Sequence, residues 1–545
     1  MFEIGHDILK HKLKDARVHR DNARRLSFVF FIFYGLFGAF IVRTLFLGID
    51  GNDVRRYNGD SGIVSRADIV DRWGRDILAK DIMSGHIIVR PVAIGDDDKN
   101  IAAQTIHQIL PYKYPLQRAI ELVDSGRKFV YLEKNASDEH RKIIKESKLY
   151  GHGFDIEPVQ MRKYPKRRLF SHVVGFVGAN NHGLEGAERT FDEYLVENAD
   201  PLRLSVDTRV QTVFYEQLSI AMNKYGARGA MGLLMNSRTG EMVAMVSLPD
   251  FDPENKDIDP VANRMFKPMR ALYEMGSIFK VFNTALAYEN GIHKEYFIAK
   301  PYKLYDKFGR VTATIGDVRS FKPPRPNLNV DEIMLHSCNV GSAQIALDLP
   351  DGAQKEFFHR LHLDERLELE FGTTEKSLMP RKWGPVERAT VSFGHGISVT
   401  PMHLLLAVNA MTNGGIYVYP TLQRRSLGAV NGERVLSPEI SEKLREIMFR
   451  ITEETSGKKA QVKGIAIGGK TATAEKRDAN GKIDKTRNLT AFAGVFPINA
   501  PQYVLLVILD EPKAVKESFG LRTAAWNAVP TAGKIIDGIL PLLFE

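Results

Sequence analysis

The chain has 545 residues, 44% of them hydrophobic, which is enough for several packed domains. Its 75 Lys and Arg against 66 Asp and Glu give a mild net charge of +9, and no basic-aromatic array argues for nucleic-acid binding. The single cysteine, Cys338, excludes an intrachain disulfide and leaves no readable cysteine-based zinc cluster.

The first predicted element is a membrane anchor at residues 26–47. Leu26–Val42 contains no charged residue, and apolar residues resume after Arg43. About 20 apolar residues span a bilayer, and an arginine near one end can extend to the headgroups. Basic residues are frequent in residues 1–25, which predicts a cytoplasmic tail there and the rest of the chain on the other side. A cleaved signal peptide is disfavoured, because the run is long and no small-x-small site follows it.

Residues 48–205 contain no catalytic pattern. Arg66–Ala79 predicts two strands joined by a glycine turn. Arg162–Pro165 and Gly183–Glu188 are two further compact motifs, and their charges suit turns, packing and interdomain ion pairs. We therefore predict a β-rich pedestal domain that serves as a spacer or docking unit.

Residues 206–545 predict a mixed α+β domain. A helix is expected at Val210–Met222, and a hairpin of two buried strands at Ala230–Met235 and Glu241–Val246. Strands early and late, with helices between them, are typical of an α+β fold. The later expected elements are helices over 387–413 and after Thr523, and extended segments at Ile465–Ala474, Leu489–Phe496 and Tyr503–Leu509.

Ser277 and Lys280 stand one helical turn apart, at the start of a buried helix predicted to stop at Asn290-Gly291. A lysine in a desolvated pocket can lose its charge and take the proton of a serine hydroxyl. The helix N-terminus would also favour a developing oxyanion. The same Ser-x-x-Lys pattern occurs at Ser125–Lys128 and Ser456–Lys459, which look like polar turns. Alone, the pattern is more typical of a helix cap.

A second motif, Ser337-Cys338-Asn339, is the only Ser-x-Asn in the chain. The Ser337 hydroxyl is suited to relay a proton, and the Asn339 amide to hold Lys280 and a substrate carbonyl. Cys338 in the middle is expected to be a small buried packing residue.

The third motif is Lys470-Thr471-Ala472-Thr473. Lys470 adds positive potential, which we expect to keep Lys280 partly neutral. Thr471 and Thr473 lie two residues apart on one strand face, where their hydroxyls could bind a carboxylate. The backbone N–H groups of Ser277 and Thr473 are the expected oxyanion hole. Together the three motifs supply what serine acyl transfer needs.

With these motifs in this order, the chain resembles the class B penicillin-binding proteins, and within them the division-specific (septal) type of Gram-negative bacteria. Residues 66–79, 183–185, 239–241, 394–401 and 413–415 also carry the resemblance, and residues 523–530 favour the septal type. Ala472 stands where the family usually has glycine. Its methyl group would crowd the space between strand and serine helix only slightly, so we expect tolerance.

The resemblance implies a serine β-lactamase-like transpeptidase domain, an antiparallel sheet with helices, behind the pedestal. It implies a D,D-transpeptidase that cross-links peptidoglycan stem peptides of a lipid-linked precursor polymer, is acylated by β-lactams at Ser277, and needs no cofactor. It also implies an inner-membrane protein with a periplasmic catalytic domain. The implied partners are division proteins of the membrane, including a glycan-polymerising one. An elongation-type transpeptidase, a β-lactam sensor and a scaffold with weakened activity remain alternatives.

Gly464–Thr471 also matches the phosphate-binding loop pattern Gly-x4-Gly-Lys-Thr. That loop needs an apolar strand before it and a helix after it. Polar residues precede Gly464 and no apolar helical stripe follows Thr473, so we do not expect a nucleotide site.

Overall fold

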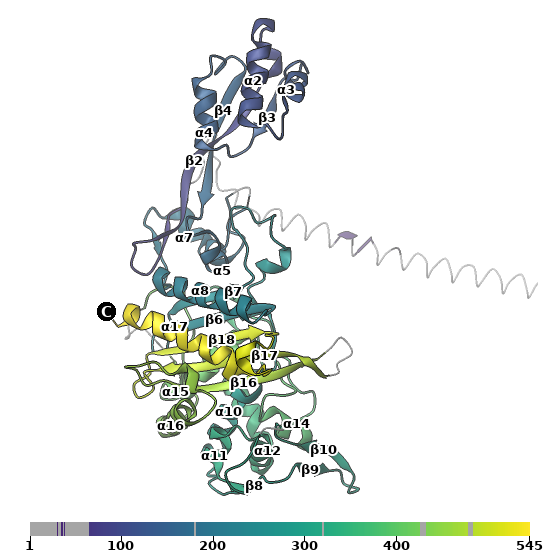
Figure 1. The fold of residues 1–545 in the computed structure, drawn as a ribbon, viewed down its shortest axis with the longest axis vertical. Coiled ribbons are helices and arrows are strands. Elements are labelled where there is room, and N and C mark those ends of the chain that lie inside the picture. Colours follow the sequence, from purple (N-terminus) through teal and green to yellow (C-terminus); the bar gives the residue numbers. More distant parts are fainter. Residues whose placement is uncertain are drawn as a thin grey trace, which may run out of the picture. The chain divides into compact units, whose positions relative to one another are not determined.

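The computed structural model describes residues 30, 34–35, 37–38, 65–178, 181–318, 321–425, 432–477 and 483–544. Contacts divide the chain into residues 1–64 and a compact unit of residues 65–545 (Figure 1). The anchor predicted at 26–47 lies almost wholly outside the described residues. Within the described ranges, no helix combines the length and apolar character of a membrane span.

The predicted pedestal begins with the expected hairpin around Gly74, in which β1 (Ile69–Val70) pairs with the start of β2 (Ile77–Val89). Farther along, β2 pairs with β3 (Val130–Glu133) and β4 (Phe154–Lys163), and β1 runs parallel to β5 (Leu202–Arg203).

Helices contain more residues of this block than strands do, so the β-rich prediction is wrong here. Buried residues of three helices pack on Ile87, Val89 and Leu132, because an apolar sheet face must be covered. The three are α2 (Lys99–Ile109), α3 (Leu116–Val123) and α4 (Asp138–Glu146). Shorter helices follow at α5 (Ser171–Val174), α6 (Gly186–Thr190) and α7 (Asp192–Glu197).

The charged motifs of this block form a buried ion network, in agreement with the structural role predicted for them. Arg66 contacts Glu188 at 3.0 Å and Asp192 at 2.6 Å. Arg162 contacts the same Glu188 at 2.7 Å and Asp81 at 3.1 Å. Both arginines and Glu188 are buried, and a buried charge is tolerated only when it is paired in this way.

A five-stranded antiparallel sheet lies at the centre of the later residues, in the order β16-β17-β18-β6-β7. The early hairpin and the late strands, predicted separately, meet where β18 pairs with β6, with Tyr503 opposite Asn236 and Asp510 opposite Gly229. The strands are β6 (Gly229–Asn236), β7 (Met242–Leu248), β16 (Gly468–Arg477), β17 (Ile483–Phe496) and β18 (Tyr503–Asp510).

Helices cover both faces of this sheet (Figure 1). On one face, α8 (Thr208–Lys224) and α17 (Ala528–Leu543) bury residues such as Phe214 and Ile535. On the other lie α10 (Phe279–Glu289), α15 (Pro401–Thr412) and α16 (Pro438–Glu454). Residues 279–287 of α10 are all buried, so this helix is the centre of the second layer.

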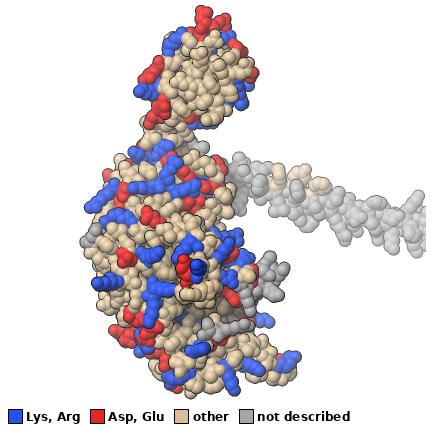
Figure 2. Space-filling view, viewed as in Figure 1, with Lys and Arg blue, Asp and Glu red and all other residues tan. Residues whose placement is uncertain are grey.

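Smaller elements surround α10. The helices are α9 (Lys267–Arg270), α11 (Val330–Leu335), α12 (Asn339–Asp348), α13 (Ala353–Arg360) and α14 (Pro385–Val391). Four two-stranded ladders pair β8 (Tyr296–Phe297) with β11 (Asn327–Leu328), β9 (Tyr302–Tyr305) with β10 (Val311–Ile315), β12 (Glu368–Leu369) with β13 (Gly372–Thr373), and β14 (Ile416–Tyr417) with β15 (Glu433–Arg434). Figure 2 shows basic and acidic side chains interspersed over the visible face of the described residues.

Candidate active site

Ser277 lies in a short 3-10 turn, η5 (Gly276–Ile278), directly before α10, rather than in the α-helix itself. Gly276 has φ +51°, a conformation that glycine adopts without strain. A Cβ built on Gly394 would lie 2.2 Å from the Gly276 carbonyl oxygen, so only glycine permits this approach. A Cβ on Gly276 would lie 3.4 Å from the carbonyl oxygen of Thr473 in β16. The turn that carries Ser277 is therefore held between the Gly394 turn and β16.

Lys280 brings the first two motifs together. Its Nζ lies 2.9 Å from Ser277 Oγ, 3.2 Å from Ser337 Oγ and 2.6 Å from Asn339 Oδ1. It also lies 2.8 Å from the Ser337 carbonyl oxygen. The carbonyl and the amide oxygen can only accept, so they take two N–H bonds of the amine. A neutral Lys280 then keeps its lone pair for the proton of a serine hydroxyl.

Burial makes that neutral state accessible. Lys280 is 1% exposed, and desolvation lowers its pKa to about 8, against the opposing effects of Asp317 and Cys338. Lys470 is fully buried, and its Nζ lies 2.9 Å from Ser337 Oγ. Burial and then the charge of Lys280 hold the pKa of Lys470 well below its ordinary value. The low pKa of Lys280 thus comes mainly from burial, and the sequence interpretation credited Lys470 with too much of it.

Ser337 bridges the two lysines from a constrained backbone. Its φ of +58° is uncommon for a residue with a Cβ, and such conformations persist where the surroundings enforce them. The next residue, Cys338, is buried as predicted, and its Sγ caps α12 by accepting from the Gly341 N–H at 3.2 Å. Asn339 begins that helix, which fixes the direction of its amide toward Lys280.

Asp317 is a site residue that the sequence interpretation missed. Its Oδ1 accepts a hydrogen bond from the Asn339 N–H, and its Oδ2 accepts one from Cys338 Sγ at 3.3 Å. A carboxylate is favoured at a helix N-terminus, and here it anchors the start of α12 beside Lys280. Asp317 is distant from the motif along the chain and belongs to no local pattern, so only the fold reveals its position.

Thr471 and Thr473 follow Lys470 on β16, where Thr471 is buried and Thr473 is exposed. Thr471 Oγ1 lies 2.9 Å from Ser456 Oγ, and Thr473 Oγ1 accepts from the Ala524 N–H at 3.0 Å. The Thr471–Ser456 pair uses one of its two hydroxyl protons and keeps the other for a further acceptor. Thr473 only accepts in its hydrogen bond, so its own hydroxyl proton is also left for an acceptor. Ser456 lies in a turn, as predicted, but the sequence interpretation did not place it at this site.

Strand β16 presents its free edge to Ser277, since it is the edge strand of the five-stranded sheet. The Thr473 carbonyl faces Gly276, and the Thr471 carbonyl lies 3.4 Å from Lys470 Nζ. The N–H and C=O of one strand residue point the same way, so the Thr473 N–H also faces η5. Ala472 is 3% exposed and packs in the core, and β16 still lies against η5.

The segment 464–471 leads into a strand that continues to Arg477. A phosphate-binding loop leads into a helix instead, so the chain lacks that geometry here. The interpretation of this match as a coincidence of sequence is confirmed.

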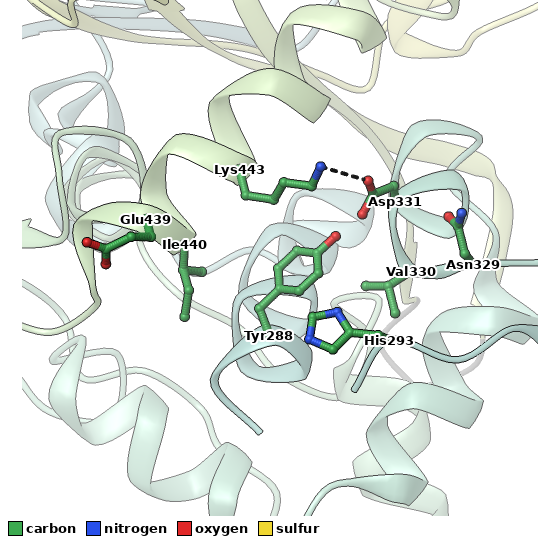
Figure 3. A pocket seen from close by; sticks show the side chains of 8 residues that line it. All are labelled: Tyr288, His293, Asn329, Val330, Asp331, Glu439, Ile440 and Lys443. Atoms are coloured by element: carbon green, nitrogen blue, oxygen red, sulfur yellow. Dashed lines mark ion pairs between the residues drawn. The ribbon is translucent and has the colours of Figure 1, made fainter. Parts of the chain in front are cut away.

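A separate cavity of about 440 Å³ lies at the opposite end of α10 (Figure 3). The Tyr288 side chain points toward the ion pair between Lys443 and Asp331, which lie 3.3 Å apart. Tyr288 stands about two helical turns beyond Lys280 on the same helix. None of the predicted site residues lines this cavity, so it is distinct from the Ser277 site.

Comparison with known proteins matches two families. Residues 230–531 match the penicillin-binding protein transpeptidase domain, and residues 63–200 match the penicillin-binding protein dimerisation domain.

Several curated proteins are similar along most of the chain. The protein named "Probable peptidoglycan D,D-transpeptidase FtsI" in Caulobacter vibrioides is 34% identical over 88% of this chain and 81% of its own length. Peptidoglycan D,D-transpeptidase FtsI of Escherichia coli is 27% identical over 90% of this chain and 85% of its own. Stage V sporulation protein D of Bacillus subtilis is 29% identical, over 88% and 78% respectively.

Proposed function

The chain belongs to the class B penicillin-binding proteins, and we propose that it is a peptidoglycan D,D-transpeptidase of the division septum. The observation that carries the proposal is the contact of Lys280 Nζ with Ser277 Oγ at 2.9 Å, made by a buried amine whose pKa is lowered to about 8. A serine and a lysine whose neutral form is accessible near pH 7 are suited, at this distance, to act as a nucleophile and its base.

In the proposed acylation, Ser277 Oγ attacks the carbonyl carbon between the two terminal D-Ala residues of a stem peptide while Lys280 takes its proton. The backbone N–H groups of Ser277 and Thr473 stabilise the oxyanion. Ser337 lies between Lys280 and Lys470, so its hydroxyl passes a proton to the leaving amine of the terminal D-Ala. The C–N bond breaks and an ester to Ser277 remains.

In the second half, the amine of a neighbouring stem attacks the ester carbonyl and gives its proton to the same lysine–serine relay. The Ser277 ester bond breaks, and a peptide cross-link forms. A β-lactam enters the first step but has no leaving group that departs, so it stays on Ser277. Acylation and cross-linking need only these side chains, because the lysine–serine relay takes a proton from each attacking group and returns it to the group that leaves.

The substrate carboxylate is assigned to the hydroxyl side of β16. Thr473 keeps its hydroxyl proton because its oxygen accepts from the Ala524 N–H. The Thr471–Ser456 pair keeps one further proton. Two O–H donors on one side of the Ser277 nucleophile suit the terminal carboxylate of a D-Ala-D-Ala end.

We assign the remaining chain by the same proposal: a cytoplasmic tail over 1–25, an anchor over 26–47, a periplasmic pedestal over 48–205 and the catalytic domain over 206–545. The enzyme acts in the periplasm from the inner membrane. Its partners are other division proteins, including one that polymerises the glycan. The names of the Caulobacter and Escherichia relatives support the D,D-transpeptidase activity, and the septal role rests on the resemblance of residues 523–530 to the septal type.

Covalent labelling with a fluorescent penicillin tests the activity. The purified full chain is expected to take up one label, Ser277→Ala none, and Ser125→Ala as much as the parent, because Ser125 belongs to an unrelated Ser-x-x-Lys turn. An unlabelled parent protein would refute the enzyme assignment. Label on Ser277→Ala would place the nucleophile elsewhere.

Depletion in the source cells tests the septal role. Filaments are expected, because septal cross-linking fails while elongation continues. Round cells would assign the protein to elongation instead. A rescue by Ser277→Ala would show that the cells need a scaffold and not the acyl transfer.

A further inference from the structure

A second cavity, of about 320 Å³, lies beside α13, and we call it the Trp383 cavity. Phe358, Met379 and Trp383 form its apolar side, with the rings of Phe358 and Trp383 6.1 Å apart. Its size is at the lower end of ligand pockets and suits one or two amino-acid side chains.

The polar groups of the Trp383 cavity are nearly all hydrogen-bond donors. Lys355, Lys376 and Arg381 line it, and within the described part of the chain none of them has an ion-pair partner. Ser377 is 5% exposed and its hydroxyl has no hydrogen-bond partner there. Asp364, the one carboxylate among the described lining residues, is 3.2 Å from His359 Nδ1. An occupant must therefore bring acceptors and negative charge.

The cations and apolar groups extend beyond the cavity itself. Lys382 is exposed next to Trp383, and Leu378, at 60% exposure, lies beside the lining residues Ser377 and Met379. An occupant that uses all of these is longer than the one or two side chains that the cavity holds. That favours an extended peptide over a compact anion.

The cavity is in contact with the catalytic helix. The Phe358 ring packs edge-on against Phe279 with centroids 5.7 Å apart, and Phe279 directly precedes Lys280. On the other wall, the Leu378 backbone exchanges hydrogen bonds with Ser398 at 2.8 and 3.0 Å. The next residue, Val399, exchanges two bonds of 3.0 Å with Tyr273, just before η5. Both walls thus lead to the segment that holds Ser277.

We propose that the Trp383 cavity docks an acidic segment of a partner protein, which inserts one aromatic or aliphatic side chain onto Phe358 and Trp383. Carboxylates beside that anchor bind Lys355, Lys376 and Arg381, and one of them accepts from Ser377. Docking changes the rate at which Ser277 is acylated, because the occupant presses on the Phe358 ring, which packs against Phe279 next to Lys280. This last part rests on the proposed function, and the docking site does not.

Binding of a fluorescein-labelled Glu-Glu-Phe-Glu peptide to the full chain, followed by anisotropy, tests the docking. The matched probes replace every Glu by Gln, or Phe by Ala. We expect binding that weakens with salt, and loss of binding for both replaced probes. Lys376→Ala/Arg381→Ala should weaken binding about tenfold, as expected for two exposed ion pairs. Lys534→Ala on α17, an exposed lysine away from the cavity, is the matched control and should bind as the parent does.

Equal binding of the Glu and Gln probes, or parent-like binding by the double variant, would overturn the proposal. If N-acetylphenylalanine binds as tightly as the peptide, the occupant of the cavity is a small anion and not a protein segment, and the proposal is overturned. Ser277→Ala should bind the probe as the parent does, so failure of the acyl-transfer proposal leaves this test intact. If saturating probe leaves the acylation rate of the parent unchanged, the coupling to Phe279 is wrong.

Discussion

The charge of Asp317 should set the pH range in which Ser277 reacts. Asp317 raises the pKa of Lys280, against the larger effect of burial that brings it to about 8. Asp317→Asn keeps the shape of the side chain and an oxygen for the Asn339 N–H. The Cys338 thiol can change from donor to acceptor, so the hydrogen bonds at the start of α12 survive the exchange. Only the negative charge is lost.

An opposite charge within about 4–6 Å shifts a pKa by about 1–3 units. Asp317 reaches Lys280 through Asn339, which separates the two, so we take the lower end of that range, about one unit. With a pKa of about 8, about 9% of Lys280 is neutral at pH 7; with about 7, about 50% is neutral. The variant should then be acylated about fivefold faster at pH 7 and about equally fast at pH 9.

Stopped-flow or quenched acylation by a fluorescent penicillin between pH 6 and 9.5 measures this ratio. The parent rate should rise with pH through about 8, because loss of the Lys280 proton creates the base. Asp97→Asn, at an exposed carboxylate of the pedestal, makes the same change in net charge and should leave the profile unmoved. A variant profile that keeps its midpoint or moves to higher pH would refute the role given to Asp317.

Three further variants should change the stability of the full chain, measured by urea unfolding. Ala472→Gly removes a buried methyl group from β16 and should lower the unfolding free energy by about 1–2 kcal/mol, with acylation changed less than about twofold. Faster acylation would show that the methyl group keeps β16 from approaching Ser277. Ser337→Gly should be about 1 kcal/mol more stable than Ser337→Ala, because alanine is strained at the positive φ of this position and glycine is not. Both variants should lose at least about 100-fold in acylation rate, and equal stabilities would contradict the backbone strain. Glu188→Ala leaves Arg66 and Arg162 buried without their shared partner and should lower the unfolding free energy by about 3–5 kcal/mol. A loss below about 1 kcal/mol would mean that water reaches the ion network.

Much of the local structure was predictable from the sequence. The structure has a helix over the predicted Val210–Met222. It also has the two strands of the early hairpin and the strand at Tyr503–Leu509 where the apolar patterns predict them. The pedestal helices α2 to α4 were not predicted. These helices carry apolar residues on one side only, and their burial depends on the sheet face that they cover.

The chain sequence by itself determined which residues carry the proposed chemistry, because the residue types and spacings of Ser277, Lys280, Ser337, Asn339 and Lys470 are those that a nucleophile, a base and a relay require. Short-range spacing fixes which groups share a helical turn or a strand face. The tertiary structure alone decided how these groups act. It buries Lys280 to lower its pKa, holds Ser337 at a positive φ between two lysines, and brings Asp317 and Ser456 from distant segments. Those contacts depend on the pairing of strands and helices far apart in the chain, and a desolvation energy exists only once that packing has formed.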